Sequence, residues 1–149
     1  ADAEFADIID LQPGSQYPSG LSRDPRQWTR AAVRDKIAWI RQCAGARFDS
    51  ISLGVPFYMF HPATNREVGA DEVREQLGAA YRAHGHEDGF PLTVEEVLGS
   101  PYLLIGSEDD MVQHVLALRR ELGLTNFLIM GKFLAGLKPV VDRVRAHVE

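Results

Sequence analysis

Three segments of this chain combine a short apolar run with a following stretch of helical periodicity. The runs cover residues 6–11, 48–55 and 125–130 and are rich in residues that favour strands. Apolar side chains then recur at i, i+4, i+7 and i+11, as Val33, Ile37, Ile40 and Ala44, as Met111, Val115, Leu118 and Leu122, and as Leu137, Val141, Val144 and Val148. A strand covered on both faces is continuously apolar, whereas a helix packed on a sheet shows one apolar stripe. The pattern predicts three strand–helix units whose strands are parallel and whose crossovers are right-handed.

Start and stop signals predict where the helices of these units lie. The helices are expected near residues 25–44, 108–122 and 134–147. Asp24 followed by Pro25 is typical of an N-cap with proline in the first turn, and Gly45 is typical of a helix end. Ser107 followed by Asp110 predicts a capped start for the second helix.

The segment from residue 57 to residue 106 interrupts this rhythm. It is about as long as a further unit, but it shows no clear strand. Residues 71–84 are predicted to form a helix, and Thr93 with Glu96 matches a capping box that opens a shorter helix. Residues 102–105 form only a short apolar run. We interpret residues 57–106 as an insertion between the second strand and its helix, a place where binding sites and subunit contacts are often built.

Composition narrows the class of protein. The 149 residues are 45% apolar and 25% charged, which is usual for one globular domain spanning residues 1–149. No apolar run approaches the roughly 20 residues that cross a bilayer, and a net charge of −5 without a basic cluster argues against nucleic-acid binding. The one cysteine, Cys43, excludes an internal disulfide, and we expect a cytoplasmic location. We expect Cys43 on the inner side of its helix and Trp28 and Trp39 packed against neighbouring units.

Four stretches together resemble one known family. Ala6-Asp-Ile-Ile-Asp-Leu11 is similar to a strand of the luciferase-like monooxygenases, and residues 36–49 are similar to a helix-to-strand passage of their actinobacterial F420-dependent oxidoreductase branch. Residues 100–108 and 118–127 resemble the last two units of that family. The similarity extends in order over nearly the whole chain, and most of the matching residues are caps and core.

This resemblance implies a TIM (β/α)8 barrel that holds FMN or F420 at the C-terminal ends of its strands. It implies hydride transfer or monooxygenation on a small organic substrate. The chain matches only the C-terminal three units, and a complete barrel needs about 250 residues. The resemblance therefore implies an N-terminal barrel portion, in a longer chain or a partner chain. The alternative is a truncated paralogue that acts as a non-catalytic structural or interaction subunit.

Candidate site residues follow from the strand ends, where barrels of this kind bind their ligands. Asp10 is a candidate catalytic carboxylate, although it can also cap the loop that follows. Residues at the C-terminal ends of the three strands are candidates for the substrate pocket; they are Leu11, Gln12, Pro13, Val55, Phe57 and Lys132. Lys132 can reach an anionic group, or it can be a helix-start lysine without a role. The aromatic run at residues 57–60 can wall a pocket or pack within the insertion.

Two further motifs have competing interpretations. His84, His86, Glu87 and Asp88 include types of side chain that bind metals, but no second cluster supports them, so we expect a solvated loop and no metal site. Gly106-Ser107 at a helix start can bind phosphate through free backbone N–H groups. The acidic residues that follow disfavour a phosphate, so capping is the preferred interpretation.

Three parallel strands have two open edges, and open edges favour pairing with another chain. We expect one face of the sheet to point into the barrel interior, and residues at candidate interior positions are Ile9, Ile51, Leu53 and either Leu128 or Ile129. Without the missing strands, these side chains remain in water. We therefore predict that the chain pairs with an N-terminal portion, associates with a copy of itself or belongs to a longer molecule, and that it is oligomeric when separate.

Overall fold

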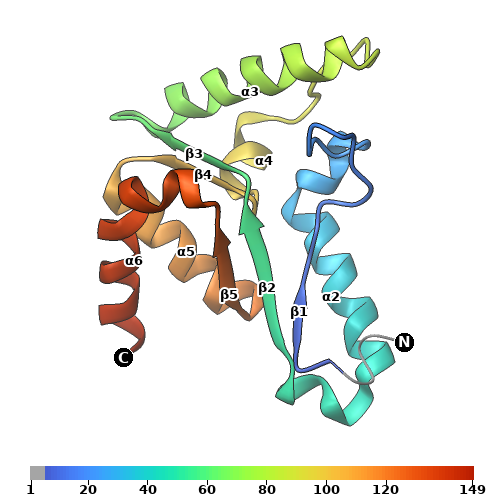
Figure 1. Cartoon of the computed structure of the whole chain (residues 1–149), viewed down its shortest axis with the longest axis vertical. Helices are drawn as coiled ribbons and strands as arrows, with labels where there is room; N and C mark the ends of the chain where they lie inside the picture. Colours follow the sequence, from blue (N-terminus) through green and yellow to red (C-terminus); the bar gives the residue numbers. More distant parts are fainter. Residues whose placement is uncertain (1–5) are drawn as a thin grey trace.

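The computed structural model describes residues 6–149 and shows an α/β structure built on parallel strands (Figure 1). The strands are β1 (Ile8–Asp10), β2 (Ser52–Phe57), β3 (Met59–Pro62), β4 (Leu103–Gly106) and β5 (Leu124–Ile129). The α-helices are α2 (Arg30–Ala44), α3 (Arg66–Ala83), α4 (Val94–Gly99), α5 (Glu108–Leu122) and α6 (Leu134–Val148). Three short 3-10 helices are η1 (Pro25–Trp28), η2 (Gly45–Ser50) and η3 (Gly131–Phe133).

The larger sheet contains the three strands that the apolar runs predict. Its strand order is β1-β2-β5, and both pairings are parallel, so this prediction is confirmed. Ile9 lies opposite Leu53 in one pairing, and Val55 lies opposite Phe127 in the other. Figure 1 shows the three strands running side by side in one direction, which brings their C-terminal ends to one edge of the sheet.

The segment at residues 57–106 contains two strands that the sequence did not reveal. β3 continues almost directly from β2 and pairs in parallel with β4. The expectation of an insertion without a clear strand is therefore wrong on this point. Each of these strands has only four residues, and β3 ends in a proline, so neither gives a long apolar or alternating signal.

The helices lie where the start and stop signals place them, with two differences. α5 spans Glu108–Leu122, as predicted, and α6 is within one residue of its expected end. The predicted helix at 25–44 is divided at Thr29, whose extended backbone ends η1 and whose side chain caps α2. α3 begins at Arg66, five residues before its expected start at 71, because Asn65 caps it by accepting a hydrogen bond from the Val68 amide. Within residues 6–149, no helix has both the length and the apolarity needed to span a membrane.

The two faces of the larger sheet differ in their covering. The face that carries Leu53, Val55 and Phe57 is buried in the same core as the apolar stripes of α2 and α5, and all three side chains are at most 3% exposed. The opposite face carries Ile8 and Leu128, which are 61% and 45% exposed. We call this second face, with Ile8, Asp10, Asn126 and Leu128, the bare sheet face.

This arrangement corrects part of the expected barrel interior. Leu53 is directly opposite Ile9 in the parallel register, so both side chains lie on the helix-covered face. Ile51, two residues before Leu53, is also buried. Leu128 does lie on the bare sheet face. The expectation failed for Ile9, Ile51 and Leu53 because a short continuous apolar run does not show which of its alternate residues face the helices.

Two side chains of α2 also differ from their expected positions. Cys43 is exposed, and Trp39 is 63% exposed. The buried stripe of α2 runs through Val33, Ile37 and Ile40, and both residues lie off this stripe. Trp28 is packed in the core as expected, and its indole Nε1 donates a hydrogen bond of 2.7 Å to the Tyr81 hydroxyl.

Candidate functional site

The loop that follows β1 is hydrogen-bonded to the C-terminal end of β2. The Tyr58 hydroxyl donates to the side-chain oxygen of Gln12, and Gln16 Nε2 donates to the Tyr58 hydroxyl over 2.7 Å. Lys36 of α2 donates from Nζ to the Gln12 carbonyl oxygen, also over 2.7 Å. Burial lowers the pKa of Lys36 below its ordinary value. These contacts hold Gln12 at the strand ends, where the sequence places the site.

The other candidate pocket residues divide into buried and exposed groups. Leu11, Pro13, Val55 and Phe57 are buried, and Val55 and Phe57 point to the helix-covered face. Val55 and Phe57 therefore do not point to the bare sheet face. Lys132 is exposed, and its Nζ lies 5.0 Å from the centre of the Phe133 ring.

Asp10 lies in a row with Gly54 and Asn126 across the three strands. The register places Gly54 opposite Asp10 on one side and Asn126 on the other. A Cβ atom at Gly54 would lie 2.5 Å from Asp10 Oδ1 and 2.8 Å from Asn126 Cβ, so only glycine lets these side chains approach so closely. Asp10 is exposed, and the row therefore presents a carboxylate and an amide to the bare sheet face.

A buried hydroxyl without a hydrogen bond lies close to the end of β2. Tyr102 is fully buried, and its hydroxyl has no partner within residues 6–149. Its ring lies 6.1 Å from the Tyr58 ring and 5.9 Å from the Trp28 ring, both edge-on. Burial raises the pKa of the Tyr102 hydroxyl, which therefore stays protonated and available to donate.

The histidines considered as metal ligands instead join two loops. His84 stacks on Tyr17 with ring centres 4.0 Å apart, and His86 Nε2 lies 2.8 Å from the Tyr17 hydroxyl. Arg23 lies over the same tyrosine ring at 4.5 Å. No group of three or more His, Cys, Asp or Glu side chains in residues 6–149 is arranged to hold a metal ion. We call the contacts of Tyr17 with Arg23, His84 and His86 the loop clasp.

The start of α5 shows the capping arrangement that the sequence favours. The Ser107 side chain accepts from the Asp110 amide, and Asp110 Oδ2 accepts from the Ser107 amide at 2.9 Å. Gly106 has a φ of +114°, and a Cβ there would lie 2.6 Å from Asp110 Oδ2. The capping contacts therefore use the Ser107 and Asp110 amides that a phosphate would need.

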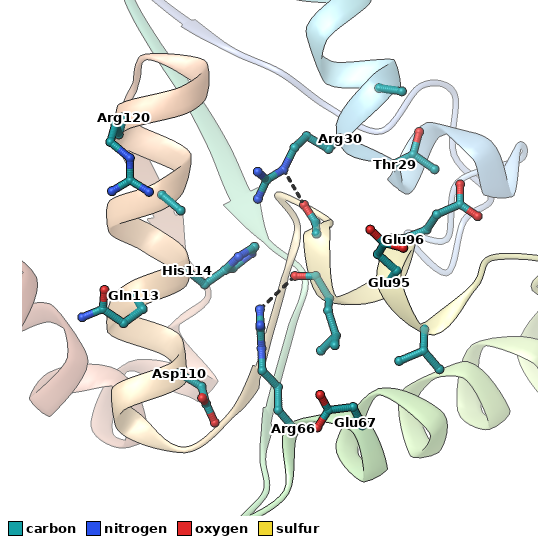
Figure 2. A pocket seen from close by; sticks show the side chains of 15 residues that line it. Thr29, Arg30, Arg66, Glu67, Glu95, Glu96, Asp110, Gln113, His114 and Arg120 are labelled. Atoms are coloured by element: carbon teal, nitrogen blue, oxygen red, sulfur yellow. Dashed lines mark hydrogen bonds between the residues drawn. The ribbon is translucent and has the colours of Figure 1, made fainter.

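A second region, the arginine cleft, lies between helices on the side of the protein away from the bare sheet face. It is an open cleft of about 970 Å³, a size at the upper end of small-molecule pockets. Figure 2 shows Arg30, Arg66 and His114 converging on its centre from α2, α3 and α5. Its lining residues are Thr29, Arg30, Ala31, Arg66, Glu67, Val94, Glu95, Glu96, Leu98, Gly99, Asp110, Gln113, His114, Ala117 and Arg120.

Backbone carbonyls position the central side chains of the arginine cleft. Arg30 Nε donates to the Gly99 carbonyl at 3.1 Å, and Arg66 Nη2 donates to the Leu98 carbonyl at 3.2 Å (Figure 2). His114 is 6% exposed, and its Nε2 lies 2.9 Å from the Ser100 carbonyl oxygen. Since a carbonyl only accepts, Nε2 carries the proton and Nδ1 is the acceptor. Burial, with smaller contributions from the charges of Arg66 and Arg30, lowers the pKa of His114 to about 4.

Sequence reasoning missed the arginine cleft because its side chains come from distant segments. Arg30 and His114 are 84 positions apart, and neither belongs to a recognisable motif. One signal was present, since His114 directly precedes Val115 of the apolar stripe of α5. A histidine at a buried helix position needs a polar partner, and this need was a reason to look for one.

Comparisons of the chain with protein-family models, with curated protein sequences and with solved structures found no match. The resemblance to luciferase-like monooxygenases therefore rests on the residues of the chain alone.

Proposed function

We propose that this chain is the C-terminal part of a luciferase-like (β/α)8 barrel oxidoreductase. The observation that supports this proposal most is the asymmetry of the larger sheet. Helices cover one face, as in the outer layer of a barrel, while Ile8 and Leu128 of the opposite face remain exposed. β1 and β5 are both edge strands. An N-terminal portion with five further strands would pair with both edges and cover the bare sheet face.

The proposed activity is hydride transfer or monooxygenation on a small organic substrate, with F420 or FMN as the cofactor. The bare sheet face suits a flat ring, because Leu128 offers apolar contact and the Asn126 amide on the same face can both donate and accept. The ring would supply hydride chemistry. Lys132, which follows β5, would contact an anionic group. Further contacts to the cofactor phosphate would come from the N-terminal portion.

Within this proposal, the residues of the chain have distinct roles. Asp10 would orient the substrate or hold a proton near the ring, since its carboxylate faces the same side as Asn126. Gln12, fixed by Tyr58 and Lys36, would close the site at the strand ends. Leu11, Pro13, Val55 and Phe57 would keep the strand ends rigid from the buried side.

Fluorescence titrations with F420 and with FMN test the proposal. The purified chain alone should bind neither cofactor tightly, because it lacks most of the phosphate-binding groups. The native protein, isolated with whatever polypeptide accompanies it, should bind one of them, and its intact mass should exceed the 16.6 kDa of this chain. Failure of the native protein to bind either cofactor would reject the proposed activity.

The second candidate is a non-catalytic subunit that pairs with another protein through its open edges. The small number of cations at the strand ends favours it, since Lys132 is the one that directly follows β5. A native complex whose partner lacks five strand–helix units, and which binds no cofactor, would support this alternative.

A further inference from the structure

Arg66 is the least satisfied cation of the arginine cleft. Arg30 and Arg120 both form ion pairs with Glu121. Arg66 forms no ion pair within residues 6–149, and its Nε is buried there without a hydrogen bond. A half-buried guanidinium without an anion is costly, because desolvation is not offset by a countercharge. Figure 2 shows its side chain extending into the middle of the cleft.

His114 adds an unused acceptor beside this cation. Its Nε2–H is committed to the Ser100 carbonyl, whereas Nδ1 makes no hydrogen bond to any residue in the described range 6–149. The centre of the arginine cleft therefore offers donors on Arg66 and an acceptor on His114. A ligand that satisfies both must carry an anionic group and an N–H or O–H donor.

The acidic side chains of the arginine cleft indicate that the hydrogen-bond donor of the ligand is positively charged. Glu96 is paired with Arg26 at 2.6 Å, and Asp110 is occupied by the cap of α5. Glu67 and Glu95 are exposed and make no side-chain hydrogen bond or ion pair to any other described residue. These two carboxylates would repel a simple anion and attract a cationic group. A ligand with both charges fits this lining better than phosphate does.

We propose that the arginine cleft binds a small zwitterion of the amino-acid type, whose carboxylate pairs with Arg66 and whose ammonium group faces Glu95 or Glu67. The guanidinium fork matches a carboxylate in shape as well as in charge. His114 accepts a hydrogen bond from the ligand through Nδ1. This site is separate from the bare sheet face, so it does not depend on the proposed oxidoreductase activity.

Calorimetric titration of the full 149-residue chain tests the proposal with glycine, 4-aminobutanoate and 6-aminohexanoate. These probes vary the separation of the two charges. At least one should bind about tenfold tighter, or about 1.4 kcal/mol, than both the carboxylate and the alkylammonium ion of the same chain length. The proposal would be overturned if the carboxylate analogue bound as tightly as the amino acid, or if none of the three amino acids bound.

Variants assign the contacts. Arg66→Gln should weaken binding of the preferred amino acid at least tenfold, whereas Arg145→Gln, an exposed arginine of α6, should leave it unchanged. Glu95→Gln should weaken the binding of the amino acid but not the binding of its carboxylate analogue. Circular dichroism checks that each variant folds. If Arg66→Gln does not fold, it is replaced by Arg66→Lys, which keeps the charge but not the planar guanidinium fork. Unchanged affinity in the folded Arg66 variant would contradict the assignment.

Discussion

Nε2 of His114 lies 2.9 Å from the carbonyl oxygen of Ser100, and this contact fixes the tautomer of an imidazole that burial keeps neutral. Burial lowers the pKa of His114 from its ordinary value of 6.5 to about 4. The unfolded chain therefore takes up a proton at a higher pH than the folded chain does. The contribution of neutral His114 to the stability of the folded chain is therefore fully present above about pH 6.5 and is lost as the pH falls toward 4.

We expect His114 to contribute up to about 3 kcal/mol of acid destabilisation between these two pH values. The amide of His114→Gln does not titrate and can still donate to Ser100. Urea unfolding near neutral pH and near pH 4.5 should therefore show a smaller loss of stability for this variant than for the wild type. Equal losses in both proteins would show that His114 is not the group responsible.

Gly54 is a position at which the structure leaves no room for a side chain. In Gly54→Ala, the new Cβ would lie 2.8 Å from both the Cβ and the backbone oxygen of Asn126, at the centre of the sheet. We expect the free energy of unfolding to fall by about 1–3 kcal/mol, as in other overpacked sites. Denaturant unfolding measures this change.

Gly131→Ala is the matched control for Gly54→Ala. Gly131 has no atom within 4 Å of its added Cβ and does not have a positive φ. Its substitution should not reduce the stability by more than about 0.5 kcal/mol, because the residue is exposed and the new methyl group meets no neighbour. A loss at Gly131 as large as that at Gly54 would mean that the crowding at the sheet centre is not the cause.

The sequence predicted the parallel sheet and its helices because their signals are local. The stripe of α5 and its cap at Ser107 define that helix without reference to the rest of the chain. β3 and β4 were missed because four-residue strands gain their identity from each other, through a pairing between residues more than 40 positions apart. Tertiary pairing of this kind leaves little trace in a short segment.

The faces of the strands were also beyond local reasoning. Leu53 and Leu128 are both leucines in apolar runs, but one is 3% and the other 45% exposed. The difference depends on which face the helices cover, and that is a property of the assembled sheet. The predicted ends of the strands were enough to name Gln12 and Lys132 as candidate site residues. The hydrogen bond between Tyr58 and Gln12 could not be predicted, because it depends on the path that the loop takes in the folded protein.

Leu128→Asp tests whether the bare sheet face is an association surface. We expect the wild-type chain to associate as its concentration rises, because exposed apolar side chains beside open strand edges favour pairing. A charge at residue 128 should weaken that association at least tenfold in sedimentation experiments, while its effect on monomer stability stays below about 1 kcal/mol. A wild-type chain that remains monomeric at every concentration would contradict this prediction.

The loop clasp gives the last prediction. Tyr17→Phe removes the hydroxyl that lies 2.8 Å from His86 Nε2 but keeps the ring that stacks on His84. We expect a stability loss of about 1 kcal/mol, the usual value of one hydrogen bond. Tyr17→Ala also removes the stack and the Arg23 contact, so its loss should exceed that of Tyr17→Phe by about 0.5–1.5 kcal/mol.

Limited proteolysis distinguishes a local effect of the loop clasp from a global one. Residues 12–22 form the loop after β1, and Tyr17 ties it to the loop that contains His84 and His86. Loss of the contact should increase cleavage within residues 12–22 before the core strands become accessible, since weakly packed loops open at lower cost than the core. If both variants were cut at the wild-type rate and with the wild-type pattern, the contacts of Tyr17 would not be what holds this loop over the strand ends.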